Sequence, residues 1–350
     1  MKNKKPHVAI FFGGEVGSHD LSTETGQWLC YYLPRSKYRV TPVRVTPQGR
    51  WQVPLGSLPE VGPVRKIMDN LFKAVRAVTP VKGLERLLRT PVDALMTVIR
   101  GRGGDDGALQ GLGASLGIPV VGSPQYACQQ TSDKYVCGQR LDSIVSAPVA
   151  RRYRRTEALD DVVREAREVF VPPLFVKPVQ QEGSYGVVEI LSHDELAPAV
   201  RATREHGDIL IQQRAPGTEL TLTLFDDGRG VIRQLPPTVV VPQHATTFYD
   251  HLAKRRTGRV ILHTPHQERL PILDEVEELA RDVYNELGCR GPVSFDVMVD
   301  EDAAELLDVN TVLTFTSLSP LMAQLKAAGV HPSTLFNSLV QRSLDEGTSN

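Results

Sequence analysis

Two segments near residue 300 carry a group of oxygen-donor side chains. Asp296 lies in the segment 293–299. Asp308 lies in the segment 305–309, and Asn310 follows that segment directly. Residues two apart in a β-strand share a face, so a hairpin of these segments presents Asp308 and Asn310 together, beside Asp296. Two carboxylates and an amide suit a hard cation such as Mg²⁺, which keeps its other positions for water and phosphate. A solvated acidic face on an ordinary hairpin is the alternative.

A lysine and a glycine-containing loop form a second candidate site. Lys177 lies near the end of the apolar segment 174–179, and the loop 180–185 follows it. A lysine there can pair with phosphate oxygens while backbone N–H groups of the loop surround them. The alternative is a hairpin turn with a surface lysine. The sequence has no G-x-x-x-x-G-K-[ST] motif, and the glycine pair at 13–14 does not complete G-x-G-x-x-G, so these two phosphate-binding fingerprints are absent.

Other catalytic patterns are also missing from the sequence. The histidines form neither H-E-x-x-H nor another ligand-like spacing, which argues against a zinc site. Ser184 lies in E-G-S-Y-G rather than in G-x-S-x-G, so a nucleophile elbow is not supported. Arginines at 151, 152, 154 and 155 could attract phosphate, but a solvated strand edge explains them better.

The elements that must position these side chains change type along the chain. Up to about residue 122, apolar runs alternate with glycine turns and helical spacing, the pattern of a doubly wound α/β sheet. Ser22 is expected to cap the first helix. Beyond this point, pairs of strands with short loops predominate. The expected strands are 8–12, 38–45, 92–99, 174–179, 186–190, 209–213, 220–225, 293–299 and 305–309, and the expected helices are 22–32, 68–78, 160–169 and 273–287.

Length and composition exclude several classes of protein. The 350 residues suggest two or three compact units at roughly 100–200 residues each. Forty basic and 41 acidic residues give a net charge of −1, which argues against a dedicated nucleic-acid binder. The sequence has no run of about 18 apolar residues, so we expect no membrane span. The N-terminus lacks the pattern of a signal peptide. The four cysteines are scattered, which indicates free thiols in a cytoplasmic protein.

Six blocks of this sequence together resemble the D-alanine–D-alanine ligase family of the ATP-grasp superfamily. The blocks occur in the family's order between residues 7 and 340. The resemblance implies an α/β (α+β) ATP-grasp fold with an N-terminal α/β domain at 1–122, a central subdomain at 123–212 and a C-terminal subdomain with the metal site at 213–350. The blocks are FFGGEVGSHDLS, RGRGGDDGALQG with GIPVVGS, SDK at 132–134, LFVKPVQQEGSYGV, FYDHLAK, and GCRGPVSFDVMVDEDAAELLDVNTVLTFTSLSP.

The resemblance also implies an ADP-forming, ATP-dependent carboxylate–amine ligase. In such a reaction a carboxylate takes the γ-phosphoryl group to form an acyl phosphate, and an amine then displaces phosphate. The implied cofactors are ATP and Mg²⁺, and the implied substrates are a small carboxylate and an amine. The roles carried over place Lys134 and Lys177 on the ATP phosphates, Glu219 on the ribose, Gln213 to Ala215 along the adenine, Asp296, Asp308 and Asn310 on Mg²⁺, and Ser184 and Lys254 in two lids at 181–186 and 248–254.

The amino-acid half of the implied site departs from the family pattern. The family glutamate that receives the ammonium group of the first D-alanine corresponds to Ser18, and a family histidine corresponds to Arg100. The lid tyrosine corresponds to Arg255. The arginine aimed at the substrate carboxylate and the oxyanion corresponds to Ser294, which has no charged fork. If all four side chains face the pocket, the pocket is about two units more positive than in the family.

Further departures affect the implied oxyanion hole and the metal site. The oxyanion-hole glycine corresponds to Thr314, and the stretch up to the substrate-site residues Ser317 and Leu318 is shortened. The metal glutamate is shortened to Asp308. Losing one oxyanion donor costs roughly 10²–10³ in rate.

Three functions therefore stay open: a ligase with substrates other than D-alanine, an authentic D-alanine–D-alanine ligase, and a nucleotide-binding pseudoenzyme. By resemblance we expect a homodimer formed through the first domain, with neither a nucleic acid nor a membrane as partner.

Overall fold

The structure is a computed structural model that describes residues 5–14, 17–181, 183–226, 231–243, 248–264, 272–301 and 303–347. Residues 15 and 16 of the first glycine loop and residue 182 of the expected lid at 181–186 lie outside this part of the chain.

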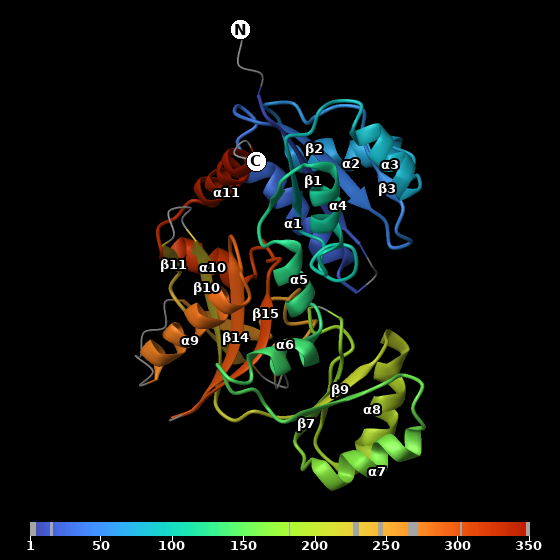
Figure 1. The fold of residues 1–350 in the computed structure, drawn as a ribbon, viewed down its shortest axis with the longest axis vertical. Coiled ribbons are helices and arrows are strands. Elements are labelled where there is room, and N and C mark those ends of the chain that lie inside the picture. The colour runs from blue at the N-terminus through green and yellow to red at the C-terminus, as the bar shows by residue number, and fades with distance from the viewer. Residues whose placement is uncertain are drawn as a thin grey trace.

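The first sheet has the order β3-β2-β1-β4-β5 and lies at one end of the molecule (Figure 1). Four strands are parallel and β3 is antiparallel to β2. The parallel sheet predicted for this region is confirmed. Its strands are β1 (His7–Gly13), β2 (Arg39–Val45), β3 (Trp51–Gln52), β4 (Ala94–Thr97) and β5 (Val120–Val121), and its helices are α1 (His19–Tyr32), α2 (Val64–Ala74), α3 (Pro80–Leu87) and α4 (Ala108–Leu116).

Strand β1 is buried on both faces because its alternate side chains enter two different cores. Ile10 and its even-numbered neighbours pack with α1, α2 and the C-terminal helix α11 (Pro332–Gly347). Phe11 and Ala9 pack on the other face with residues of α3 and α4. β1 therefore needs a continuous run of apolar residues, whereas a strand with one exposed face would alternate apolar and polar residues.

The expected role of Ser22 is wrong. Helix α1 begins at His19, with Ser18 as the preceding residue, so Ser22 lies inside the helix. The buried Ser22 hydroxyl accepts a hydrogen bond from the Gly13 N–H (2.9 Å) and donates one to the Val98 carbonyl (2.7 Å). It thus ties α1 to the ends of β1 and β4, and a local capping pattern cannot reveal such distant partners.

The second sheet is antiparallel, with the order β6-β9-β7-β8. Helices α7 and α8 cover one of its faces, where they pack against Leu174, Val176, Ile209 and Ile211. The side chains between them, including Lys177, lie on the opposite face. The elements are β6 (Ala150–Tyr153), α7 (Leu159–Val169), β7 (Leu174–Pro178), β8 (Val188–Ile190), α8 (Leu196–Thr203) and β9 (Ile209–Gln213), with 3₁₀ turns at His193–Glu195 and Arg204–His206.

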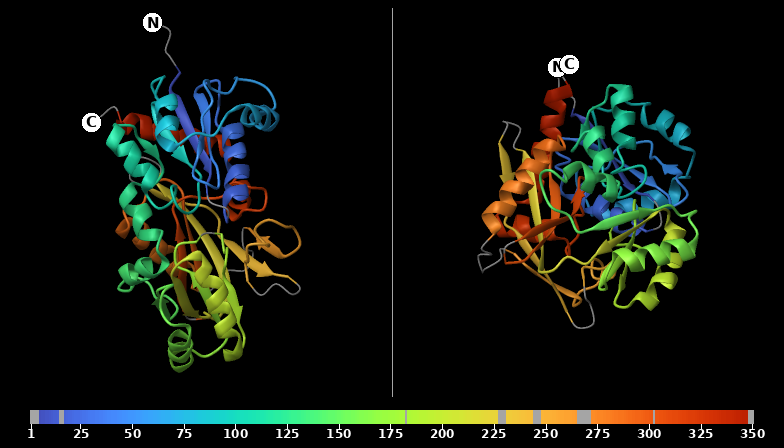
Figure 2. Two further views of the ribbon diagram at one scale, coloured as in Figure 1. Left: turned by 90° about the vertical axis from the view of Figure 1, so that its right-hand side faces the viewer. Right: turned by 60° about the horizontal axis from the view of Figure 1, so that its bottom comes forward.

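The third sheet is antiparallel, with the order β13-β12-β10-β14-β15, and β11 pairs with β10. Its back face packs on α9, α5 and α6 through one apolar core. Figure 2 shows this sheet beside the second one. The elements are α5 (Gln125–Thr131), α6 (Lys134–Leu141), β10 (Thr218–Asp226), β11 (Ile232–Gln234), β12 (Thr238–Pro242), β13 (Val260–His263), α9 (Leu273–Glu286), β14 (Val293–Val299), β15 (Ala304–Asn310) and α10 (Pro320–Ala327).

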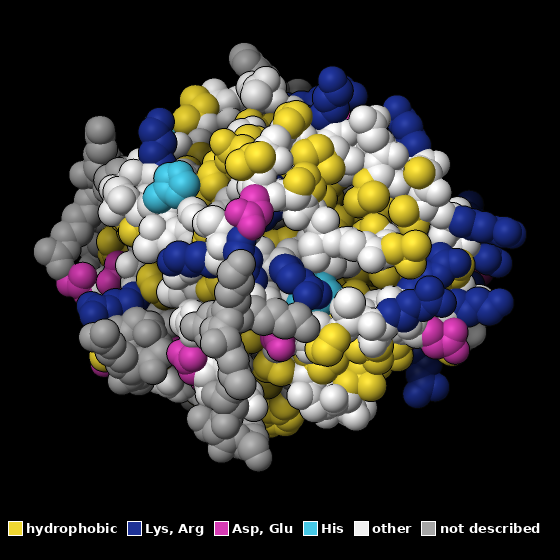
Figure 3. Space-filling model, turned by 90° about the horizontal axis from the view of Figure 1, so that it is seen from above, with side chains coloured by type: hydrophobic (Ala, Val, Ile, Leu, Met, Phe, Trp, Pro, Cys, Tyr) yellow, Lys and Arg dark blue, Asp and Glu magenta, His cyan; other side chains and the backbone are white. Residues whose placement is uncertain are grey.

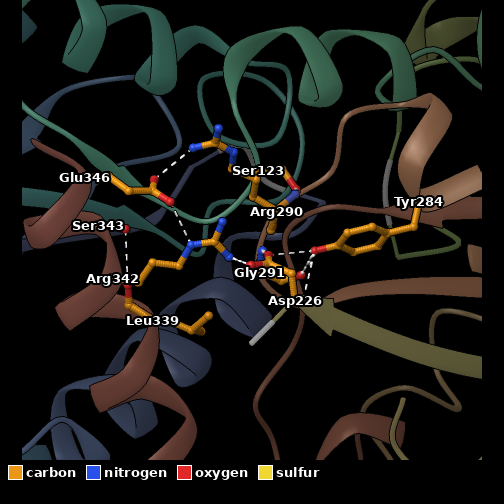
Figure 4. A network of polar contacts seen from close by, with 9 residues as sticks. All are labelled: Ser123, Asp226, Tyr284, Arg290, Gly291, Leu339, Arg342, Ser343 and Glu346. Atoms are coloured by element: carbon orange, nitrogen blue, oxygen red, sulfur yellow. Dashed lines mark hydrogen bonds and ion pairs between the residues drawn. The ribbon is translucent and has the colours of Figure 1, made fainter. Parts of the chain in front are cut away.

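The C-terminal helix α11 is joined to the third sheet by a polar network (Figure 4). Arg342 of α11 forms ion pairs with Asp226 at the end of β10 and with Glu346. The Tyr284 hydroxyl lies 3.0 Å from Asp226 Oδ2, and Glu346 pairs with Arg290 at 2.8 Å. Because α11 also enters the core of the first sheet, this network links the two sheets. Among the described residues, none of the helices has the length and apolar character needed to cross a membrane.

Candidate active site

A cavity of about 380 Å³ lies between the second and third sheets and extends toward the first. Strands β7 and β9 form one wall, and β10, β14 and β15 form the other. Most of the predicted site residues meet here, and these are Arg100, Lys134, Lys177, Ser184, Gln213, Ala215, Glu219, Lys254, Ser294, Asp296, Asp308, Asn310 and Thr314. Ser18, Arg255, Ser317 and Leu318 are not among the residues that line it.

Alternation along β14 explains why its polar residues face the cavity. Val293, Phe295 and Val297 belong to the core, whereas Ser294, Asp296 and Met298 line the cavity. The predicted hairpin is confirmed, and β14 has the predicted bounds. Asp296 lies opposite Asp308, and a register shift follows this pair.

The oxygen-donor group predicted for Mg²⁺ is compact. Asp296 Oδ1 accepts a hydrogen bond from Thr221 Oγ1 at 2.8 Å, and Asp296 Oδ2 accepts one from Asn310 Nδ2 at 3.2 Å. Asp308 forms an ion pair with Lys134 at 3.2 Å. Two carboxylates and an amide oxygen on one wall fit Mg²⁺, which takes few protein ligands and retains waters. Thr221, which the sequence analysis missed, lies two residues after Glu219 on the same face of β10.

The two lysines predicted for phosphate lie close to this group. Lys177 Nζ donates to Gln212 Oε1 of the neighbouring strand β9 and lies 5.1 Å from the centre of the Phe175 ring. Burial lowers the pKa of Lys177 to about 8, with nearby Asp308 acting in the opposite direction. The low value reflects a cation held without full solvation, which bound anionic phosphate would stabilise. The predicted strand position of Lys177 is confirmed.

Glu219 is a buried carboxyl group in the wall of the cavity. Burial raises its pKa to about 7, and the neighbouring Asp296 carboxylate adds to the shift. Nearby, Ala215 lies in the cavity wall, while the Gln213 side chain hydrogen-bonds the backbone of Val171 and Pro173. The Gln213 side chain at the edge of the cavity is therefore held in place by the backbone of Val171 and Pro173.

Apolar side chains that were not predicted as site residues also line the cavity. Met298, Leu307, Val240 and Phe248 line it from the third sheet and the segment that follows β12. Alternation from Asp296 would have indicated Met298. The register shift in the hairpin brings Leu307 to the same face as its neighbour Asp308, which simple alternation does not predict.

The two expected lids meet at Ser184. Its hydroxyl donates to the Tyr249 carbonyl (3.0 Å) and accepts a hydrogen bond from Lys254 Nζ (2.9 Å). Ser184 has φ 58°, a left-handed conformation that is uncommon outside glycine. Next to it, the Tyr185 ring lies between the rings of His206 and His251, with centroids 5.0 and 5.1 Å away.

The second lid also contacts the first glycine loop. Arg255 Nη2 donates to the Gly17 carbonyl at 3.0 Å. A Cβ atom at Gly17 would lie 2.8 Å from the Tyr185 ring, so only glycine allows this approach without movement. Arg255 therefore links the segment that follows Lys254 to the first domain, and it is not among the residues that line the cavity.

Arg100 enters the cavity from the loop after β4. Its Nη1 lies 3.4 Å from Thr314 Oγ1, and its Nη2 donates to Asn310 Oδ1. Its carbonyl accepts a 2.5 Å hydrogen bond from Ser18 Oγ. Ser18 thus acts on the backbone of Arg100 and does not reach the cavity, while Ser317 is exposed and the Leu318 carbonyl accepts from Tyr249 Oη at 3.2 Å.

Comparisons with known proteins agree with this arrangement. The family model described as the D-Ala–D-Ala ligase C-terminus matches residues 144–341, and the model of the N-terminus matches residues 7–123. The chain belongs to the D-alanine–D-alanine ligase family. The ligase of Nocardia farcinica is 26% identical over 97% of this chain and 98% of its own length, and that of Deinococcus radiodurans is 28% identical over 98% and 99%.

Solved structures of this family share the fold. The VanG D-Ala:D-Ser ligase of Enterococcus faecalis has a TM-score of 0.78 at 21% identity and covers 97% of this chain and 100% of its own. A Bacillus anthracis D-alanine–D-alanine ligase complexed with ATP has a TM-score of 0.71 at 24% identity, with 99% coverage of both chains. The predicted ATP-grasp fold is therefore confirmed.

In this member of the D-alanine–D-alanine ligase family, the substituted positions are not all equivalent. Ser294, Arg100 and Thr314 face the cavity, whereas Ser18 and Arg255 hold backbone carbonyls at its border. In the loop that carries Arg100, Asp105 Oδ1 accepts a hydrogen bond from the Gly101 N–H at 2.8 Å. The condition for the expected gain of positive charge is therefore not met: of the side chains in that count, only Arg100, which adds a charge, and Ser294, which removes one, line the cavity.

Proposed function

We propose that this protein is an ATP-dependent carboxylate–amine ligase whose acid substrate is not D-alanine. The family is one of ADP-forming ligases. One observation carries the proposal. Three lysines and three oxygen-donor side chains line the same cavity between two antiparallel sheets, and these are Lys134, Lys177, Lys254, Asp296, Asp308 and Asn310. Phosphoryl transfer needs this combination of positioning and charge neutralisation.

The residues of the cavity would divide the work as follows. Lys134 and Lys177 hold the phosphates, and Glu219 accepts hydrogen bonds from the ribose. The apolar wall at Met298 and Leu307 contacts the purine, with the backbone of 213–215 along its edge. Lys254 and the loop at Ser184 cover the γ-phosphate and exclude water, which would otherwise hydrolyse the acyl phosphate.

Asp296, Asp308 and Asn310 would hold Mg²⁺. The ion, when bound, neutralises charge on the transferred phosphoryl group. Asp308 now pairs with Lys134, so the lysine must move toward the phosphates as the carboxylate turns to the ion.

The described cavity wall favours an acid without an α-ammonium group. Its carboxylates are Glu219, Asp296 and Asp308, all of which belong to the proposed nucleotide and metal sites. The remaining wall of the cavity includes the apolar side chains Leu21, Leu313 and Leu321. A hydroxy acid or a small apolar acid fits these surroundings better than D-alanine, because a buried ammonium needs a carboxylate partner.

The test is phosphate release from MgATP with a panel of acids, each with and without amine acceptors. The panel pairs D-lactate with D-alanine and propionate, and the ligated product is identified by mass spectrometry. We expect amine-dependent ADP formation with at least one acid that lacks an α-ammonium group. Turnover restricted to D-alanine would instead identify an authentic D-alanine–D-alanine ligase.

A second candidate function is a nucleotide-binding pseudoenzyme. Ser294 and Thr314 favour it, because they replace a charged fork and a backbone donor of the family's oxyanion site. ATP binding without turnover of any acid in the panel would support this function and reject the ligase.

We also propose a cytoplasmic homodimer formed through the first domain. The location follows from the need for ATP. Figure 3 looks onto the first-domain end of the molecule, where hydrophobic side chains gather in patches on the surface. Tyr31, Leu55, Val61 and Val81 of this domain are large hydrophobic residues that remain exposed. Light scattering that gave the mass of one chain across the working concentration range would reject the dimer.

A further inference from the structure

Gln212 of β9 is a buried polar residue in the wall of the cavity, and it directly precedes the segment 213–215. Ile211 packs in the core of the second sheet, so alternation along β9 turns the Gln212 side chain to the opposite face. Gln212 is only 6% exposed, and it pairs across the sheet with Phe175, which lines the same cavity. The Gln212 amide is therefore placed to contact a bound nucleotide.

The contact with Lys177 determines which atom of the Gln212 amide remains for a ligand. Lys177 Nζ donates a hydrogen bond to Gln212 Oε1. With a pKa of about 8, Lys177 is mostly an ammonium group at pH 7, and an ammonium group has donors only. The amide oxygen must therefore face Lys177. Among the described residues, none accepts a hydrogen bond from Gln212 Nε2, so this group is left as a buried donor.

A second donor of this kind lies three residues further along the chain. Ala215 lines the cavity, and its backbone N–H has no acceptor within the part of the chain that the structure describes. Gln213 does not supply an acceptor to the cavity, because its Oε1 accepts the Val171 N–H at 3.3 Å and its Nε2 donates to the Val171 and Pro173 carbonyls. Buried donors such as these need acceptor atoms from a ligand.

Purine bases differ in what they present to such donors. Adenine carries an amino group at position 6, which is a donor, whereas guanine and hypoxanthine carry the acceptor O6. In the proposed complex Glu219 receives the ribose, which is attached at N9 of the purine. The opposite edge of the base, with its substituent at position 6, then lies along residues 212–215.

We infer that Gln212 makes this nucleotide site favour a 6-oxopurine, as in GTP or ITP, over adenine. The inference rests on the proposed function, which places the purine along the segment 213–215. Donation from Gln212 Nε2 to O6 satisfies both groups, whereas an adenine amino group at the same place leaves the buried donor unpaired. ATP remains a substrate, because the proposed contacts to its phosphates and ribose do not depend on the base.

The experiment measures binding of ADP, GDP and IDP with Mg²⁺ by calorimetry in wild type, Gln212→Glu, Gln212→Met and the control Gln129→Glu. Gln212→Glu keeps the size of the side chain but replaces the donor by an acceptor, and Gln212→Met removes both. Gln129 is an exposed residue of α5 outside the cavity wall. The readout is the Kd for ADP divided by the Kd for IDP, because a new charge near the phosphates affects both ligands equally.

We expect wild type to bind IDP at least as tightly as ADP, and we expect the ratio to fall roughly tenfold or more in Gln212→Glu. Gln212→Met should lie between the two, and Gln129→Glu should match wild type. A wild type that binds ADP more tightly than both IDP and GDP overturns the inference and leaves the ligase proposal intact, as does an unchanged ratio in both Gln212 variants. The expected ratios without phosphate release from ATP, GTP or ITP with any acid of the panel support the inference and reject the ligase. A wild type that binds none of the three nucleotides rejects both.

Discussion

At the scale of single residues, the cavity brings buried groups of both charges together. Lys177 and Glu219 both lie in its wall. Burial lowers the pKa of Lys177 and raises the pKa of Glu219, and each shift favours the neutral form of the group. Such shifts cluster at functional sites, since a site built to bind charge desolvates its own charged groups.

Replacing Lys177 by Met should weaken binding of a non-hydrolysable ATP analogue at least tenfold, because the change removes a buried cation that lies beside the phosphates in the proposed complex. The melting temperature of the ligand-free protein should not fall, since the variant no longer buries an incompletely solvated ammonium. Calorimetry gives the affinity. Lys326→Met, at an exposed lysine of α10, is the control. Unchanged affinity in Lys177→Met would show that the phosphate assignment is wrong.

Replacing Glu219 by Gln should stabilise the ligand-free protein at pH 8 more than at pH 5. The carboxyl pKa is about 7 in the folded chain against an ordinary 4.5, so the folded state binds more protons between these values. The unfolding free energy of wild type therefore falls as the pH rises through this window, and Gln removes that loss. The gain at pH 8 should be on the order of 2–3 kcal/mol. Urea unfolding at both pH values measures it, and an equal effect at both would refute the assignment.

The strand residues of this site could be predicted from their spacing, whereas loop residues such as Arg100 and Ser184 were predicted only through the resemblance to the family. A period of two places Asp296, Asp308 and Asn310 on one face whatever else the chain does. The contact of Arg100 with Asn310 joins residues 210 positions apart, and it depends on how two sheets pack. Local patterns hold no information on such a contact.

At the scale of elements, the same distinction holds. The sequence predicts β9 and β14 with the bounds they have, because each is a short apolar or alternating run. The expected helix 68–78 instead spans 64–74, immediately after Pro63. Strands β11 to β13 were not predicted. β11 and β13 are short and only partly buried, whereas β12 lies inside the sheet, between β13 and β10.

The two lids should be coupled through the Ser184 side chain. Ser184→Gly keeps the left-handed conformation without strain but removes the hydrogen bonds to Lys254 and Tyr249. With about 1 kcal/mol for each of the two hydrogen bonds, opening of residues 249–254 should become roughly thirtyfold more frequent. Hydrogen exchange of these amides in the ligand-free protein measures the opening.

The control for this prediction is hydrogen exchange in β14 of the same variant. β14 contributes to the core of the third sheet, so its amides should stay protected. If the amides of residues 249–254 exchanged at the wild-type rate, the hydrogen bonds of Ser184 would not hold the lids together.

At the scale of the whole molecule, α11 connects distant parts of the chain. Phe336 is fully buried in the core of the first sheet, where its ring packs 4.6 Å from Phe315. Phe336→Ala should lower the unfolding free energy by about 3–5 kcal/mol, as other large-to-small changes in cores do. Denaturant unfolding measures this loss.

The same variant should also increase hydrogen exchange in β1, although β1 is more than 300 residues away in sequence. Gln341→Ala, at an exposed position of α11, is the matched control. Normal protection of β1 in Phe336→Ala would show that α11 is dispensable for the first sheet.

The position of α11 has a consequence for how the protein is made. On the ribosome, β1 emerges early, while α11 follows every other element. The face of the first sheet that receives Leu335, Phe336 and Leu339 stays uncovered until then. The first domain therefore spends most of translation with an open apolar surface, a state in which chaperones bind and aggregation begins. Closure of this face therefore waits for α11, although the strands that it covers are synthesised far earlier.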